Sequence, residues 1–200
     1  IILGLSAATN SLNESTETTA LDEVSAPQEV ILPLSSLNEP GHQEGSIFTD
    51  TTFSSGAAHT CAILDDGSVS CWGAGSNGRL GNGGVSSVTT PTSTSSLGAG
   101  RTAVASSSGL THTCAILNDG SVSCWGRGFV GQLGNGGTST ATTPTPTSSL
   151  GTGRTAVAIS SGGTHTCAIL DDGSVSCWGG GTSGRLGNGG TSDKNTPTPT

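Results

Sequence analysis

The sequence has little of what most enzymes and nucleic-acid-binding proteins carry. Among its 200 residues there is no Met or Tyr, aromatic residues make up 3%, and charged residues make up 10%. Six Lys and Arg stand against fourteen Asp and Glu, so the chain lacks the basic footprint that nucleic-acid binding requires. No apolar run is long enough to cross a bilayer. We therefore expect neither a nucleic-acid partner nor a membrane span.

What the sequence has instead is a repeat. A fifteen-residue stretch occurs three times, and only Asn118 differs between the copies: HTCAILDDGSVSCWG at 59–73 and 165–179, HTCAILNDGSVSCWG at 112–126. The copies follow one another at a strict period of 53 residues. The 33 Gly and abundant Ser and Thr would suggest disorder without a period. A fixed period near this length indicates a repeat architecture.

Each copy predicts a β-hairpin that turns at residues 65–67 or their equivalents. A three-residue loop ending in Gly suits a type I turn closed by a left-handed residue. This register places Leu64 opposite Ser68, and Cys61 opposite Cys71 in a non-hydrogen-bonded pair, where two strands approach most closely. Apolar side chains fall on both faces of the hairpin, so we expect both faces to be covered, as in blades stacked around an axis.

The six cysteines fall two to a repeat. Repeat symmetry favours pairing within each copy, and the hairpin register allows it; the alternative is buried free thiols in a cytosolic protein. Paired cysteines indicate an oxidising compartment, so we expect an extracellular or cell-surface location. The predicted pairs are Cys61–Cys71, Cys114–Cys124 and Cys167–Cys177.

The segments around the hairpins complete the blade. Small residues at 103–105 and 156–158 suit an inner strand near the axis of a propeller. After each hairpin, a glycine-rich connection contains one apolar anchor, at Leu80, Leu133 or Leu186. The Thr-Pro run that follows must be an edge strand or an extended outer segment, because proline cannot donate to a ladder.

Three motifs recur at fixed spacing: the arm H-T-C-A-x-L, then D-G-x-V-x-C-W-G, then G-[QR]-L-G-x-G. In these motifs, residues 47–200 resemble the regulator of chromosome condensation repeat family. The resemblance implies an all-β propeller, usually of seven four-stranded blades, of which about three are present here. We therefore expect missing blades of the same chain as partners. The family's members include an exchange factor that binds chromatin, a plant photoreceptor and secreted bacterial proteins, among them a β-lactamase inhibitor, so the fold selects no activity. This chain has no basic tail for chromatin, and one Trp per blade is ordinary packing.

Several motifs could indicate a cofactor. Gly73, Gly75 and Gly78 have the spacing of a dinucleotide-binding fingerprint, but the Leu-Gly-Asn-Gly-Gly that follows cannot propagate the helix this motif needs. His59 with Cys61 and Cys71 supplies only three zinc ligands, so we expect a disulfide and a His that hydrogen bonds to backbone. The Asp turn lacks the later bidentate Glu of a calcium loop.

No catalytic constellation stands out, because every repeated His occupies the same slot and a catalytic site rarely recurs identically three times. We therefore expect no enzyme, no metal and no cofactor. The repeated His and Trp are interpreted as structural positions: His59, His112, His165, Trp72, Trp125 and Trp178.

The first quarter of the chain differs from the rest. Residues 1–8 match the end of a secretory signal peptide, and residues 9–46 read as an acidic, Ser/Thr-rich disordered linker. Residues 1–50 contain eight acids and no Lys or Arg. The missing Met and the mid-repeat stop at Thr200 lead us to expect a fragment.

Function is predicted from the loops. A propeller places variable loops on a rigid frame, where recognition usually resides. We expect a non-enzymatic propeller that binds a protein or glycan through the loop positions that vary most. The alternatives are an exchange factor for a small GTPase and a purely structural spacer. The candidate contacts are Phe129, Arg127, Val130 and Asn77.

The linker prediction can be tested by amide hydrogen exchange. Residues 9–46 have too little apolar content to offset the entropy of ordering, so their amides should exchange rapidly while those of the hairpins are protected. Slow exchange at residues 30–34, the short apolar island of the linker, would contradict this expectation.

Overall fold

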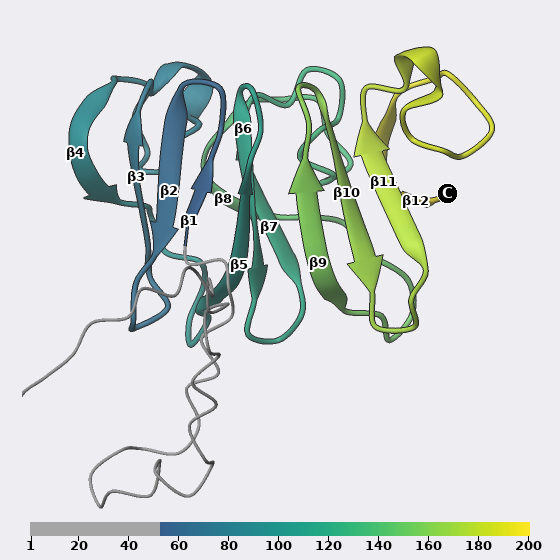
Figure 1. Ribbon diagram of the computed structural model, residues 1–200, viewed down its shortest axis with the longest axis horizontal. Coiled ribbons are helices and arrows are strands. Elements are labelled where there is room, and N and C mark those ends of the chain that lie inside the picture. Colours follow the sequence, from purple (N-terminus) through teal and green to yellow (C-terminus); the bar gives the residue numbers. More distant parts are fainter. Residues whose placement is uncertain (1–52) are drawn as a thin grey trace, which may run out of the picture. The chain divides into compact units, whose positions relative to one another are not determined.

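The computed structural model describes residues 53–200, so the predictions for residues 1–8 and 9–46 lie outside the described residues. Within residues 53–200, twelve strands form three four-stranded antiparallel sheets (Figure 1). Blade 1 contains β1 Phe53–Ser55, β2 His59–Ile63, β3 Val69–Gly73 and β4 Val88–Ser93; blade 2 contains β5 Ala103–Ser108, β6 His112–Leu117, β7 Val122–Gly126 and β8 Ala141–Pro146; blade 3 contains β9 Ala156–Ser161, β10 His165–Leu170, β11 Val175–Gly179 and β12 Lys194–Pro199. The prediction of three four-stranded blades is confirmed.

Each blade is a meander whose strands pair in chain order. The first strands, β1, β5 and β9, lie next to one another, as the small residues of β5 and β9 predict for an inner position. The Thr-Pro strands β4, β8 and β12 are the opposite edges of their sheets, as predicted (Figure 1). Prolines such as Pro91, Pro144 and Pro197 remove N–H donors there, which blunts an otherwise open edge.

The hairpin register is confirmed residue by residue. Ile63 pairs with Val69 and Cys61 with Cys71, and the Leu64 amide donates to the Ser68 carbonyl across the turn. The Cα atoms of the paired cysteines are 4.1 Å apart in all three blades, as expected of a non-hydrogen-bonded pair. A disulfide joins each of the three predicted pairs, and residues 53–200 contain no free cysteine.

Burial follows from how the blades stack. Every residue of β6 and β7, in the middle blade, is buried. In blade 3, β10 alternates between buried residues such as Thr166 and residues that are half-buried, such as His165, or exposed, such as Ile169. Blade 1 exposes the other face, with Leu64 in solvent and His59 buried. The His/Cys/Ile face of one blade therefore packs on the Thr/Ala/Leu/Trp face of the next, and the expected double cover is complete only in blade 2.

Two apolar clusters fill the two spaces between blades. The first joins the Cys61–Cys71 disulfide and Leu80 of blade 1 to Leu117 and Trp125 of blade 2. The second repeats this arrangement between blades 2 and 3. The three predicted leucine anchors are at most 1% exposed. No helix within residues 53–200 has the length and hydropathy that a membrane crossing demands.

The stacking predicts unequal effects for equivalent tryptophans. Trp125→Ala should cost about 3–5 kcal/mol, because it removes a fully buried ring and its hydrogen bond. Trp72→Ala should cost clearly less, because Trp72 lies half-buried on the uncovered face of blade 1. Urea denaturation of the full chain measures both values. Equal losses would contradict the assigned stacking order.

Candidate functional site

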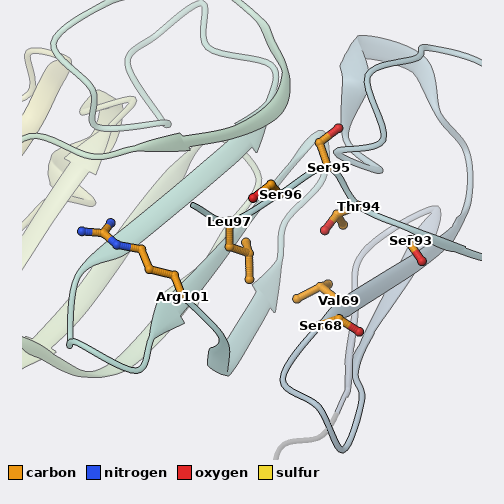
Figure 2. A pocket seen from close by; sticks show the side chains of 8 residues that line it. All are labelled: Ser68, Val69, Ser93, Thr94, Ser95, Ser96, Leu97 and Arg101. Carbon is orange, nitrogen blue, oxygen red and sulfur yellow. The ribbon is translucent and has the colours of Figure 1, made fainter. Parts of the chain in front are cut away.

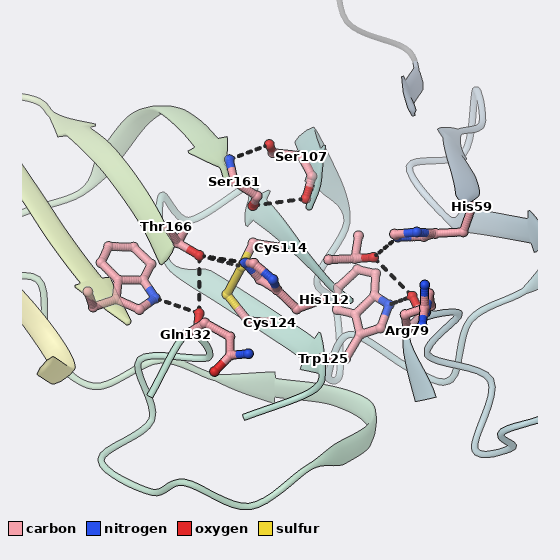
Figure 3. The surroundings of a disulfide bond; sticks show 12 residues. His59, Arg79, Ser107, His112, Cys114, Cys124, Trp125, Gln132, Ser161 and Thr166 are labelled. Carbon is pink, nitrogen blue, oxygen red and sulfur yellow. Dashed lines mark hydrogen bonds between the residues drawn. A yellow bond between two sulfur atoms is a disulfide. The ribbon is translucent and has the colours of Figure 1, made fainter. Parts of the chain in front are cut away.

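One backbone carbonyl joins blade 1 to blade 2. The carbonyl of Arg79 accepts a hydrogen bond from the Thr113 hydroxyl at 2.9 Å and another from Trp125 Nε1 at 3.0 Å (Figure 3). Both donors are completely buried. Two buried donors thus share one acceptor across the blade boundary, which satisfies groups that would be costly to leave unpaired.

The same arrangement recurs one blade later. The Gln132 carbonyl accepts from the Thr166 hydroxyl at 3.1 Å and from Trp178 Nε1 at 3.0 Å. The tryptophan in turn lies against Gly134, where a Cβ would come within 2.7 Å of its Nε1. Gly134 also has a φ of +68°, so glycine is required there on two grounds.

The repeated histidines belong to this network. His59 Nε2 lies 2.7 Å from the Thr113 hydroxyl, and His112 Nε2 lies 2.9 Å from the Thr166 hydroxyl. Because each hydroxyl already donates to a carbonyl, it must accept from the histidine, so the neutral ring carries its proton on Nε2. The expected hydrogen bond from His to backbone was wrong: the partner is a threonine side chain of the next blade, which the hairpin pattern alone could not place.

Burial keeps these histidines neutral. It lowers the pKa of His59 and of His112 to about 4, and the neighbouring Arg79 adds to the effect at His59. The Nδ1 atoms of both rings are buried and have no partner within residues 53–200, so a second proton would find no acceptor. His165, half-buried on the open face of blade 3, has its pKa lowered by burial and by Arg185. These residues are structural in their contacts, and residues 53–200 contain no cluster of metal ligands.

A small hollow lies between the hairpin of blade 1 and the segment that connects β4 to blade 2. It holds about 180 Å³ and is lined by hydroxyl groups, two aliphatic side chains and Arg101 (Figure 2). The guanidinium points away from Val69 in Figure 2 and forms a 3.0 Å salt bridge with Asp119. The hollow offers hydroxyls but no carboxylate, imidazole or thiol. Its lining consists of Ser68, Val69, Ser93, Thr94, Ser95, Ser96, Leu97 and Arg101.

A second, more open hollow of about 360 Å³ lies where the three inner strands end. Equivalent Ser-Gly pairs of the three blades line it, and Leu110 is its largest apolar side chain, 48% exposed. Hydroxyls of neighbouring inner strands bond to one another here, as Ser54 does to Ser108 at 2.9 Å. Like the first hollow, it is lined by serine hydroxyls and contains no carboxylate, imidazole or thiol in its lining.

The loops that follow β3, β7 and β11 form the end of the blades opposite the hairpin turns (Figure 1). Among the predicted contacts, Phe129 is 57% exposed, and the Arg127 guanidinium lies 4.8 Å from the centre of its ring. Val130 is half-buried on the same loop. Asn77 is half-buried on the equivalent loop of blade 1 and does not share this surface patch.

The loop of blade 2 differs in backbone as well as in sequence. Asn77 and Ser183 adopt left-handed φ values of 60° and 64° inside short 3-10 turns, η2 Ser76–Gly78 and η3 Thr182–Gly184. Val130 takes their place in blade 2, and a β-branched residue disfavours that conformation. Its amide instead donates to the Gln132 side-chain oxygen at 3.0 Å. Phe129 and Arg127 are therefore displayed by a loop with its own support.

Sequence reasoning missed the carbonyl that joins the blades. The repeated Thr after each His and the repeated Trp were visible signals for buried donors. Their acceptor is a main-chain atom of a residue that is Arg in one blade and Gln in the next, so no side-chain pattern marks it.

The family model for the regulator of chromosome condensation (RCC1) repeat matches residues 66–116 and 119–169, and a second model of this repeat matches 51–79, 103–132 and 156–185. The chain belongs to the regulator of chromosome condensation repeat family. The predicted resemblance and its three copies are confirmed.

Relatives within the RCC1 repeat family are much longer than this chain. The ultraviolet-B receptor UVR8 of Arabidopsis thaliana is 34% identical over 182 residues, which are 90% of this chain and 37% of UVR8. The human E3 ubiquitin-protein ligase HERC2 is 35% identical over 144 residues, 72% of this chain and 3% of that protein. Yeast RCC1 (Prp20), solved bound to Kap60, superposes with a TM-score of 0.66 at 22% identity, covering 74% of this chain and 36% of its own. The last likeness shows the propeller fold alone.

The buried histidines predict how stability depends on pH. Between pH 6.5, their ordinary pKa, and pH 4, the unfolded chain binds protons that the folded chain does not. The free energy of unfolding should therefore fall as the pH drops through this window. Melting temperature against pH measures this. His112→Gln keeps an N–H donor without titrating and should flatten the slope; an unchanged slope would contradict the assignment.

Proposed function

We propose that this chain is a non-enzymatic binding propeller of the extracellular space or cell surface, which recognises a protein or glycan through the loop after β7. The observation that carries the proposal is the exposed Arg127–Phe129 pair on that loop. A large aromatic ring that is 57% exposed contributes little buried area to the fold, whereas Arg and aromatic residues are frequent energetic centres of interfaces.

Other features agree with a binding role for this end of the molecule. The network between the blades uses its His, Thr and Trp side chains for packing and hydrogen bonds. The two hollows contain no acid, histidine or cysteine in their linings. The blades thus form a frame, and the loop after β7 departs from the equivalent loops in both sequence and backbone.

The proposed location rests on the cysteines. Three disulfides form within the hairpins, and disulfides persist in oxidising compartments. Relatives such as UVR8 and yeast RCC1 share the fold, but the chain covers little more than a third of either, so their roles are not carried over.

Arrays of extracellular proteins and glycans test the proposed function. The full chain, secreted from an oxidising expression host, should bind one or more array members, and Phe129→Ala should weaken that binding at least tenfold, roughly the loss expected for a hot-spot aromatic. The matched control is Val85→Ala, which removes a 58% exposed side chain from the equivalent loop of blade 1 and should leave binding unchanged.

Three results would overturn the proposal. Binding that is indifferent to Phe129→Ala would place recognition elsewhere. Acceleration of nucleotide release from a small GTPase by the unreduced chain would favour the exchange-factor alternative. A complete absence of binding by a folded, disulfide-bonded chain would favour a structural spacer.

A further inference from the structure

The two ends of the blades carry opposite charge. The six acids of residues 53–200 are balanced by six bases, but five of these acids lie at the hairpin turns. There Arg101 and Arg154 form salt bridges with turn aspartates at 3.0 Å. The loop end holds the remaining charges, which are four cations and one acid: Arg79, Arg127, Arg185, Lys194 and Asp193. The neutral repeat region therefore has an acidic turn end and a basic loop end.

The loop cation of blade 2 is exposed, whereas that of blade 1 is buried. In blade 1, Arg79 is only 6% exposed, and its guanidinium donates to the Ser76 carbonyl and hydroxyl and to the Leu110 carbonyl of blade 2. The equivalent residue of blade 2 is the neutral Gln132, and the cation stands instead at Arg127. The Arg127 guanidinium makes no salt bridge within residues 53–200 and rests over the Phe129 ring. Arg127 is exposed to solvent.

The neighbouring blade adds to this surface. Gly131, at the end of the loop, packs against the backbone of Lys194 and Asn195 at the start of β12. Lys194 replaces the Val88 and Ala141 that begin β4 and β8. The carboxylate of the adjacent Asp193 accepts a hydrogen bond from the Gly181 amide at 2.9 Å, so it is engaged within its own blade.

The shape of the surface favours a protein partner. Small ligands occupy concave sites, and Arg127, Phe129 and Val130 line neither of the two hollows described above. The Arg127 guanidinium lies 4.8 Å from the centre of the Phe129 ring. A ligand that contacts both must therefore carry a carboxylate and an apolar group at similar spacing. Neighbouring side chains of a peptide segment supply both.

We infer that the Arg127–Phe129 pair binds an acidic peptide segment of a partner protein, with an Asp or Glu carboxylate on the Arg127 guanidinium and an adjacent apolar side chain on the Phe129 ring. This inference rests on the proposed binding function and names the partner's chemistry. Bidentate contact between a guanidinium and a carboxylate gives direction as well as strength, and the basic loop end steers an acidic segment toward it.

Selection from displayed random peptides tests the inference. The full chain and its variants are used as bait at low ionic strength. The wild type should enrich peptides in which Asp or Glu adjoins an aliphatic or aromatic residue. Arg127→Glu should weaken these peptides at least tenfold, roughly the loss of one charge-assisted contact, and should enrich Lys or Arg peptides instead. The matched control, Arg154→Glu, makes the same charge change at the turn end and should select the wild-type peptides.

The outcomes distinguish a failure of the acidic-segment inference from a failure of the proposed binding function. If Arg127→Glu enriches the same acidic peptides while Phe129→Ala removes them, the acidic-segment inference fails and the proposed function stands. If neither substitution changes the selection, both fail. A parallel array of sulfated and carboxylated oligosaccharides serves as the competing arm: binding there through Arg127 that exceeds every selected peptide would overturn the peptide assignment.

Discussion

The whole stack depends on a main-chain oxygen that accepts two buried hydrogen bonds from the following blade. The carbonyl of Arg79, and that of Gln132 one blade later, receives a threonine hydroxyl and an indole N–H. The threonine in turn fixes a histidine of the preceding blade. Aromatic residues are scarce, so the chain cannot stack its sheets on bulky apolar side chains alone. A short polar chain through the interface sets the angle and register of each blade.

The hairpins could be predicted because their determinants are local. A Gly-closed turn fixes which residues oppose each other, and this register brings each cysteine pair together. The leucine anchors and the Thr-Pro edge strands followed from composition at fixed positions. Each of these features needs only a few consecutive residues and one rule of backbone geometry.

What could not be predicted depends on contacts between blades. The hydrogen-bond partner of His59 lies 54 residues away on the next blade, and the acceptor for Trp125 is a backbone atom that has no side-chain signature. The loop variation at Arg127 and Phe129 was visible, but their stacking was not. The change from Arg79 to Gln132 was visible in the repeat as well, but its consequence depends on the burial of Arg79, which the sequence does not show.

The interface between blades is directional. One face of each blade offers a histidine and a carbonyl oxygen, and the other offers a threonine and a tryptophan, so a blade can stack on its neighbour in only one order. The two interfaces are almost identical, and the hairpin copies differ at a single residue, Asn118. Copying one 53-residue unit within the array would thus create a new interface that is already compatible on both sides. Such a fold tolerates changes in repeat number during evolution far better than changes within a repeat, and it leaves the loop after each third strand free to diverge.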